Sequence, residues 1–418
     1  MNSLTEKDYR YLWHPFTQMK DWMAEDPVII ASAEGAVLRD TEGREYLDAN
    51  SSIWTNLHGH RHPRITAAIK DQLDRIAHSS FLGLSNVPAI ELAEKLAALT
   101  GLPRVFYSDD GSTAIEVAIK MSLQYWRHRR QAGRTKFVAF ADAYHGDTLG
   151  AVSMGGIDLF HAAFKPLLFE VLRVRDVASL QKVLREQHDS IAGVCIEPLI
   201  QGAAGMRLWP RGLLADVRQL CDYFDTLMIA DEVMTGFGRT GTMFACEQEK
   251  VVPDLMAVAK GLTGGYLPLA ATMATEQIFN VFLGEYEEFK TFFHGHSYTG
   301  NQLGCAAALA NLQVFEDERT LENLKSKIAN LKQGLEQCRQ LSHVVDVRQC
   351  GFIGAVEIGP YRIEEQMGIK VCREMRQRGV LTRPIGNVIV LMPPYCVTTE
   401  QLERMVTALA ESVRAVCG

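Results

Sequence analysis

The sequence predicts an α/β fold in which a mostly parallel central sheet is flanked by helices. Two observations support this class. In the middle of the chain short apolar runs alternate with helical patterns, and several of these runs end at a polar or glycine-rich turn. In open sheets of this kind, ligands bind beyond the carboxyl ends of the strands. We therefore expect the turns to converge on one pocket.

Each expected strand is a short apolar run. The strands are Val105-Phe106-Tyr107, Phe137-Val138-Ala139-Phe140, Ile191 to Ile196, and Leu227-Met228-Ile229-Ala230. The polar turns that end such runs are Ser108-Asp109-Asp110-Gly111-Ser112, Tyr144-His145-Gly146-Asp147, Glu197-Pro198 and Asp231-Glu232. A helical run from Ala114 to Lys120 follows the first turn, so Gly111 and Ser112 are expected to open a helix.

The end of the chain has a different pattern. Apolar residues spaced three and four apart from Leu321 to Cys338 predict a helix that packs on a small sheet. The last helix is expected to begin after Thr398, because Thr398 to Gln401 has the spacing of a capping box. We divide the chain into an N-terminal segment (1–55), a large domain (56–310) and a C-terminal small domain (311–418).

The composition is that of an ordinary globular enzyme. Of 418 residues, 47% are hydrophobic and 22% charged, and the net charge is -7. The 43 Lys and Arg are scattered, which argues against a nucleic-acid surface. The first residues lack an apolar targeting segment, and no later run is long enough to span a membrane. Nine Cys without C-x-x-C spacing fit reduced thiols, so we expect a cytoplasmic protein without structural metal.

Lys260 and Asp231 carry the main chemical signal. Lys260 lies among small and apolar residues, 29 positions after Asp231. A lysine in such surroundings can lose its proton and condense with an aldehyde. A carboxylate at the end of an apolar strand can pair with a protonated pyridine nitrogen and keep the ring an electron sink. Each residue alone also fits a loop lysine or a helix cap, but together they predict a pyridoxal 5'-phosphate (PLP) site.

Three further positions have both a functional and a structural interpretation. Gly111 and Ser112 open a helix, where free N–H groups and the helix dipole favour a phosphate, although a plain helix start is also possible. Tyr144 could cover a flat ring or be a core tyrosine. Arg383 stands beside Pro384 and could bind a substrate carboxylate with two hydrogen bonds, or be a surface arginine.

Two other patterns have weak functional interpretations. The run from Gly236 to Gly241 satisfies G-x-G-x-x-G, but it does not directly follow a strand and no acidic residue stands at the expected distance, so NAD binding is not expected. His58, His60 and His62 alternate in a turn without a carboxylate or Cys at ligand spacing, which favours turn structure over a metal.

Together these residues resemble the class III aminotransferases, which are PLP enzymes of fold type I, over nearly the whole chain. The motifs are Asp231-Glu232-Val233, Gly236 to Gly241, and Lys260-Gly261-Leu262-Thr263-Gly264-Gly265. The segment from Leu12 to Met19 is similar to members that convert 8-amino-7-oxononanoate to 7,8-diaminononanoate in biotin biosynthesis, with S-adenosyl-L-methionine as the usual amino donor. The resemblance also implies a smaller α+β domain built from both termini.

The resemblance implies a role for each matching residue. Lys260 would hold PLP and move a proton, Asp231 would pair with the pyridine nitrogen, and Tyr144 would cover the ring. Gly111 and Ser112 would bind the phosphate, and Arg383 the substrate carboxylate. Gly295 and Ser297 resemble the stretch that reaches the phosphate of the neighbouring subunit's cofactor, which implies a homodimer with shared active sites.

Three positions depart from the members that use S-adenosylmethionine. Phe16 stands where they have Tyr, Ile53 where they have Trp beside the retained Trp54, and Val390 where they have Tyr. Each change removes a hydroxyl or an aromatic face that could hold a sulfonium or an adenine. Members that use L-lysine resemble this chain at these positions. The sequence therefore leaves two donors open, with a general ω-aminotransferase as a further alternative.

Overall fold

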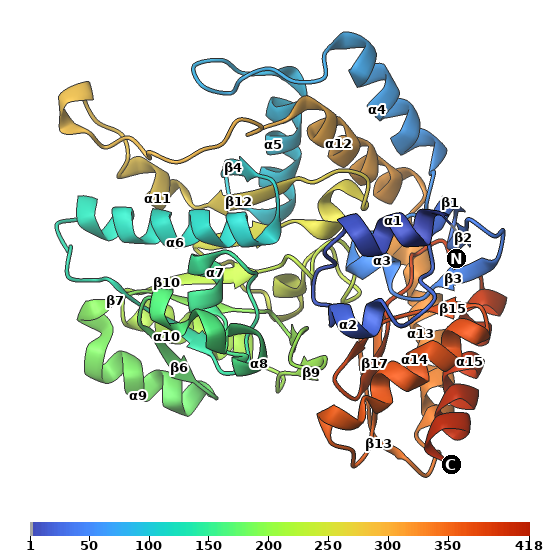
Figure 1. The fold of residues 1–418 in the computed structure, drawn as a ribbon. Coiled ribbons are helices and arrows are strands. Elements are labelled where there is room, and N and C mark those ends of the chain that lie inside the picture. Colours follow the sequence, from blue (N-terminus) through green and yellow to red (C-terminus); the bar gives the residue numbers. More distant parts are fainter. Residues whose placement is uncertain (1–2) are drawn as a thin grey trace.

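A seven-stranded sheet lies at the centre of the fold in the computed structural model, which describes residues 3–418 (Figure 1). In spatial order its strands are β4 (Arg104–Ser108), β12 (Ala270–Ala274), β11 (Leu255–Val258), β10 (Leu227–Asp231), β7 (Ile191–Ile196), β5 (Lys136–Phe140) and β6 (Val171–Val174). Only β12 runs antiparallel to its neighbours β4 and β11. The predicted α/β class and the four predicted strands are confirmed.

Helices cover both faces of this sheet because its strands are apolar on both faces. In β10, Met228 and Ala230 point into the core on one side, while Leu227 and Ile229 point into the core beneath α6 (Gly111–His128). The first side is covered by α9 (Val177–Gln187) and α10 (Leu213–Tyr223). Around the β4 edge lie α4 (Pro63–Arg75), α5 (Val87–Thr100) and α12 (Gln302–Asp317).

Both ends of the chain build the region beside the large sheet, where blue N-terminal strands lie next to orange and red C-terminal elements (Figure 1). One sheet contains β1 (Ile30–Glu34), β2 (Val37–Asp40), β3 (Glu45–Asp48) and β15 (Val380–Leu381), and β15 is parallel to β3. The other contains β13 (Val344–Cys350), β14 (Ile353–Ile358), β17 (Val388–Leu391) and β16 (Pro384–Ile385). The helices α13 (Thr320–Cys338), α14 (Met367–Gln377) and α15 (Thr399–Cys417) pack here.

The C-terminal helix predictions are confirmed. The α13 helix covers the predicted stripe, and Thr398 caps α15 through a capping box with Gln401. The predicted boundary at residue 310 falls inside α12, and the domain limits stay predictions. The remaining α-helices and strands are α1 (Ser3–Tyr11), α2 (Met19–Trp22), α3 (Ser51–Trp54), α7 (Leu149–Met154), α8 (Asp158–His161), α11 (Glu276–Asn280), β8 (Ile200–Gln201) and β9 (Arg207–Leu208). Among residues 3–418, no helix has the length and apolar character needed to cross a membrane.

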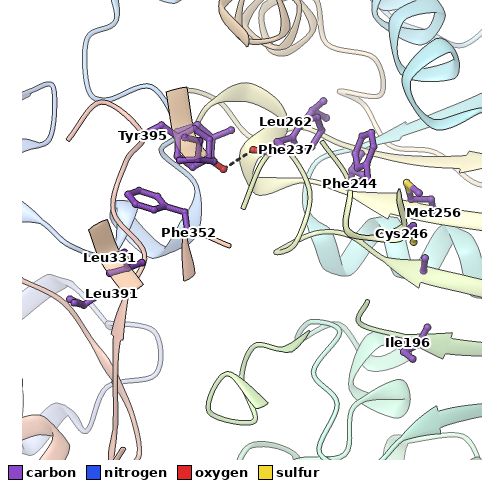
Figure 2. Close-up of a cluster of buried hydrophobic side chains, with 14 of the residues drawn as sticks. Ile196, Phe237, Phe244, Cys246, Met256, Leu262, Leu331, Phe352, Leu391 and Tyr395 are labelled. Atoms are coloured by element: carbon purple, nitrogen blue, oxygen red, sulfur yellow. Dashed lines mark hydrogen bonds between the residues drawn. The ribbon is translucent and has the colours of Figure 1, made fainter. Parts of the chain in front are cut away.

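One hydrophobic core joins the large and small parts of the molecule. Figure 2 shows Phe352 and Tyr395 on one side of it and Phe237 and Phe244 on the other. The Tyr395 hydroxyl donates to the Phe237 carbonyl oxygen at 2.7 Å, so the contact is directional as well as apolar. The neighbouring Arg239 is fully buried and donates to backbone carbonyl oxygens of both parts.

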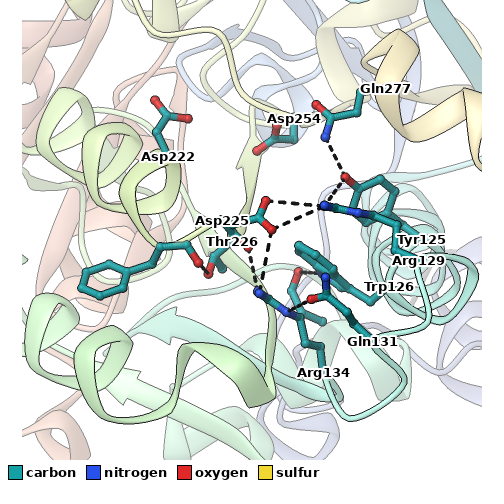
Figure 3. A network of polar contacts seen from close by, with 12 residues as sticks. Tyr125, Trp126, Arg129, Gln131, Arg134, Asp222, Asp225, Thr226, Asp254 and Gln277 are labelled. Carbon is teal, nitrogen blue, oxygen red and sulfur yellow. Dashed lines mark hydrogen bonds and ion pairs between the residues drawn. The ribbon is translucent and has the colours of Figure 1, made fainter.

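A polar network fixes the C-terminal end of α6 (Figure 3). The Arg134 guanidinium stacks 3.9 Å from the Trp126 ring centroid and donates to the Asp225 carbonyl oxygen at 2.6 Å. The indole of Trp126 donates to the Ala192 carbonyl oxygen of β7 at 2.7 Å. The helix is therefore anchored at the end opposite to Gly111, which fixes where its first turn lies.

Candidate active site

A cavity of about 520 Å³ opens beyond the carboxyl ends of the central strands. It is lined by residues that follow five different strands: Asp109, Asp110, Gly111 and Ser112 after β4, Tyr144, His145 and Gly146 after β5, Glu197 after β7, Asp231 at the end of β10, and Ala259 and Lys260 after β11. Parallel strands have their carboxyl ends at the same edge of the sheet, so side chains that are distant in sequence meet there. The predicted polar turns thus do converge on one pocket.

Lys260 lines this cavity directly after β11. Its φ of +40° is unusual for a residue with a side chain, and conformations of this kind are held only where the surroundings fix them. Its Nζ lies 4.6 Å from the centroid of the Trp54 ring. Burial lowers the pKa of Lys260 to about 8, although Asp231 and Glu197 act in the opposite direction. A useful fraction of the amine is therefore uncharged near neutral pH and able to react as a nucleophile or base.

Asp231 is paired with a buried histidine. One carboxylate oxygen lies 2.6 Å from His145 Nδ1, and the other accepts the Val233 N–H at 3.1 Å. Burial works against a charge on His145, but contact with Cys195 and Asp231 raises the pKa of the imidazole well above its ordinary value. Asp231 thus has a cationic partner on one side and lines the cavity, where its carboxylate could pair with a protonated pyridine.

Glu197 is a second buried carboxyl group at the cavity wall. Its two oxygens accept the Tyr144 N–H at 3.2 Å and the Gly202 N–H at 2.9 Å, so it holds two of the turns that form the pocket. Burial raises the pKa of Glu197 to about 7, and the Asp231 charge acts in the same direction. Glu197 therefore titrates close to neutral pH.

Replacing Glu197 by Gln is expected to change how stability depends on pH. An ordinary glutamate ionises near pH 4.5, whereas buried Glu197 keeps its proton to about pH 7. The wild type therefore loses stability as the pH rises across this interval, because the unfolded state binds fewer protons than the folded state. Glu197→Gln removes this loss. Between the two pH values, the free energy of unfolding of the variant should therefore rise relative to that of the wild type by up to about 3 kcal/mol. Urea unfolding of both proteins at several pH values measures this, and parallel profiles would refute it.

Tyr144 and Asp147 belong to the turn that follows β5. The Tyr144 hydroxyl donates to Asp147 Oδ2 at 2.6 Å. The Tyr144 ring also contacts His161, whose ring is nearly parallel to it at 14° with centroids 6.1 Å apart, and the edge of Phe160 at 6.3 Å. Burial raises the pKa of Tyr144, so the hydroxyl stays protonated and keeps this hydrogen bond. The ring is held on the cavity wall in one orientation.

The first turn of α6 forms a cradle in the cavity. Asp110 caps the helix by accepting the Thr113 N–H at 3.0 Å, while the N–H groups of the first turn have no intrahelical partner. A Cβ on Gly146 would lie 2.0 Å from Ser112 Oγ, so only glycine lets the two turns pack this closely. The cradle suits a phosphate, and a reactive amine and the Asp231 carboxylate lie in the same cavity. The residues present therefore fit PLP.

The segment Ser51–Trp54 forms a rare left-handed turn at the cavity wall. All four of these residues have positive φ, from +47° to +93°, and none is glycine. Such a conformation costs about 1–2 kcal/mol per residue. The turn points Trp54 into the cavity, with 9% of its surface exposed, and leaves Ile53 47% exposed.

The other predicted substrate residues lie outside the cavity lining. Phe16 is 56% exposed, and its carbonyl oxygen accepts a hydrogen bond from the Arg383 guanidinium. Val390 is fully buried in a cluster with Trp54 and Met234, and it does not line the cavity. Gly295 and Ser297 are exposed on the loop between α11 and α12.

Sequence reasoning missed the residues that hold others in place. His145 and Asp147 stand in the predicted turn, but only Tyr144 was singled out, and Glu197 was noted only as the end of a strand. The signal that could have found them is their position, since each is a polar residue after a buried strand at the edge where ligands bind. The alternating histidines have structural partners: His60 Nε2 lies 3.2 Å from Asp48, and His62 Nε2 lies 3.1 Å from Glu318.

Comparisons with known proteins give one consistent result. The family model described as aminotransferase class-III matches residues 19–413. Adenosylmethionine-8-amino-7-oxononanoate aminotransferase from Geobacter sulfurreducens is 50% identical, covering 100% of this chain and 98% of the relative. The relative of the same name from Aquifex aeolicus is 47% identical, covering 99% and 97%.

Solved structures agree with the sequence relatives. The crystal structure of adenosylmethionine-8-amino-7-oxononanoate aminotransferase from Methanocaldococcus jannaschii superimposes with a TM-score of 0.97 at 44% identity, covering 99% of both chains. An amine transaminase from an uncultivated Pseudomonas species, solved in the PLP-bound form, has a TM-score of 0.91 at 32% identity, covering 98% of this chain and 99% of the other.

Proposed function

The chain belongs to the class III aminotransferases, and from this premise we propose that it converts 8-amino-7-oxononanoate to 7,8-diaminononanoate in biotin biosynthesis. It is a PLP-dependent enzyme, as its family and its PLP-bound structural neighbour show. The observation that carries the proposed substrate is the full-length identity of 50% to a relative named for this reaction. The cavity supports the proposal with an amine, a carboxylate and a phosphate cradle in one place.

Each side chain of the cavity would have its own role in the reaction. Bound PLP supplies a ring that takes up the electron pair released at the substrate carbon next to nitrogen. Lys260, with its pKa lowered to about 8, would accept the proton from that carbon and return it to the cofactor carbon bonded to the same nitrogen. Asp231, which is paired with His145, would hold the pyridine nitrogen protonated. Tyr144 would cover one face of the ring and exclude water.

Arg383 is proposed to bind the carboxylate of the keto acid. Its guanidinium donates to the Phe16 carbonyl oxygen. The carboxylate of the substrate could take the place of this oxygen and would be a stronger acceptor because it is charged. Phe16 would border the same space, since its ring lies 5.4 Å from that of Phe160, which lies 6.3 Å from the Tyr144 ring of the cavity lining. Ile53 would border it from the turn that carries Trp54.

Replacing Arg383 by Ala is expected to raise KM for the keto acid by about 10–100-fold with a smaller effect on kcat, because a charge-assisted pair with a remote carboxylate contributes about 1.5–3 kcal/mol to binding. Steady-state kinetics with varied 8-amino-7-oxononanoate measure this. Arg362→Ala is the matched control, because Arg362 lies far out on the surface with its side chain 81% exposed. An unchanged KM in Arg383→Ala would remove Arg383 from the substrate site.

We propose S-adenosyl-L-methionine as the amino donor, which the names of the relatives support. L-Lysine is a second candidate on a specific observation: Phe16 and Ile53 lack the hydroxyl and the indole that could hold a sulfonium or an adenine. The test is to mix the purified enzyme and 8-amino-7-oxononanoate with each donor in parallel and to measure diaminononanoate. Product formed with L-lysine alone would overturn S-adenosyl-L-methionine as the donor, and absence of product with both donors would refute the reaction itself.

The proposal includes a homodimer with shared sites. Gly295 and Ser297 lie on an exposed loop, where they are available to a second subunit. Large apolar side chains are exposed on this loop and on the segment before α5, including Phe293 at 73% and Leu82 at 82%. Monomeric proteins rarely expose such side chains in groups, and a second copy would cover them. Light scattering coupled to gel filtration tests this. A cytoplasmic location also belongs to the proposal, and the nine free cysteines support it.

A further inference from the structure

We infer that Asp48 is a positioning residue of the active site, which fixes Trp54 against the Lys260 amine by holding the left-handed turn Ser51–Trp54 in place. The inference rests on the assignment of Lys260 as the amine that bonds PLP. Asp48 is the last residue of β3, is 2% exposed, and does not line the cavity. Its effect on chemistry is therefore indirect, through the turn.

The carboxylate of Asp48 accepts several hydrogen bonds from the turn. Its Oδ1 accepts the Asn50 N–H at 3.2 Å and the Ser52 N–H at 3.1 Å, and its Oδ2 accepts the Ser52 hydroxyl at 3.1 Å. His60 Nε2 lies 3.2 Å from Oδ2 and completes its surroundings. Four non-glycine residues do not adopt positive φ unless something holds them, and these contacts reach the turn from a rigid strand.

Two more hydrogen bonds fix the turn to its surroundings. The Trp54 indole donates to Asn50 Oδ1 at 2.9 Å, and the Ser51 hydroxyl donates to the Met392 carbonyl oxygen at 2.7 Å. Asp48 pairs with Leu381 of β15, two residues before Arg383. The strand that carries Asp48 therefore sets the position of Trp54 and lies beside the segment that leads to Arg383.

The face of the Trp54 ring stabilises the charged form of the Lys260 amine. The amine lies 4.6 Å from the Trp54 centroid, a distance at which an aromatic face stabilises the charged form of an amine. The other charged groups that act on Lys260 are Asp231, Glu197 and Arg239. If the turn relaxes, the ring moves away and the amine loses this contribution, while those three groups stay on their own strands and loops.

The test follows the rate at which the full-length protein, freed of PLP, takes up PLP at different pH values, because only the uncharged amine reacts with the aldehyde. Trp54→Leu removes the ring face and should lower the midpoint of this profile by about 0.5 unit or more. Asp48→Ala should lower it in the same direction, and the double variant should shift no further than the larger single shift, because both changes remove one interaction.

Controls separate this inference from other effects. Asp40→Ala removes an equally buried carboxylate in the same sheet, which accepts the N–H groups of Glu42 and Arg44, and should leave the midpoint unchanged. If Asp48→Ala does not fold, Asp48→Asn is used in its place; its amide keeps one acceptor but loses the Oδ2 that accepts the Ser52 hydroxyl, so a smaller shift in the same direction is expected. Lys260→Ala must take up no PLP covalently, which tests the underlying assignment separately. A wild-type midpoint in the Asp48 or the Trp54 variant, or additive shifts in the double variant, would overturn the inference.

Discussion

Lys260→Ala is expected to lose covalent PLP and to reduce amino transfer by at least about 10³-fold, since one side chain supplies both the covalent attachment and the proton transfer. The lost attachment should abolish the visible absorption of the bound cofactor. Steady-state assays and an absorption spectrum of the PLP-treated variant measure the two effects together.

Lys327→Ala is a matched control for this variant. Lys327 is also partly buried, and its ammonium donates to the Tyr395 carbonyl oxygen, but it does not line the cavity. It should keep both the absorption and the activity while costing some stability. A Lys260→Ala protein that retained the visible absorption and turnover would show that another amine holds the cofactor.

Asp231→Asn is expected to reduce kcat by about 10²–10³-fold while PLP still binds, because the ring loses the anion that keeps its nitrogen protonated. The phosphate cradle and Lys260 remain, so cofactor content should change little. The loss should also free His145, whose Nδ1 lies 2.6 Å from Asp231, and lower its pKa toward the value of a buried neutral imidazole. Kinetics and an NMR titration of the histidines measure the two effects.

Asp254→Asn is the corresponding control. Asp254 accepts the Met228 N–H at 2.7 Å and pairs with Arg218 at 2.7 Å, so it supports the same strand β10 without facing the cavity. It should lower stability and leave kcat near the wild-type value. Equal losses of kcat in the two variants would mean that Asp231 acts only through the fold.

Local patterns predicted the large elements because each depends on a short stretch of sequence. The run Leu227-Met228-Ile229-Ala230 is apolar at every position, and it forms a strand covered on both faces. The capping box at Thr398 fixes the start of α15 in the same way. Lys260 and Asp231 were found because lysine and aspartate in apolar surroundings are exceptional, and the structure brings both to one cavity.

The contacts that position these residues could not be predicted, because they join distant segments. His145 meets Asp231 across 86 positions, and nothing near either residue specifies the other. The left-handed turn at Ser51–Trp54 contains no glycine, so its sequence does not indicate positive φ. The sequence predicts Val390 as a substrate residue, but only the packing of β17 shows that its side chain is buried in one cluster with Trp54.

The most direct measurement of the central claim is the fate of the donor nitrogen. Wild-type enzyme is supplied with 8-amino-7-oxononanoate and a donor whose transferable amino group carries nitrogen-15, and the product is examined by mass spectrometry. The expected product is 7,8-diaminononanoate with one heavy nitrogen, which comes from the labelled donor, and its formation depends on PLP. Unlabelled diaminononanoate, or a keto acid recovered unchanged with both S-adenosylmethionine and L-lysine, would contradict it.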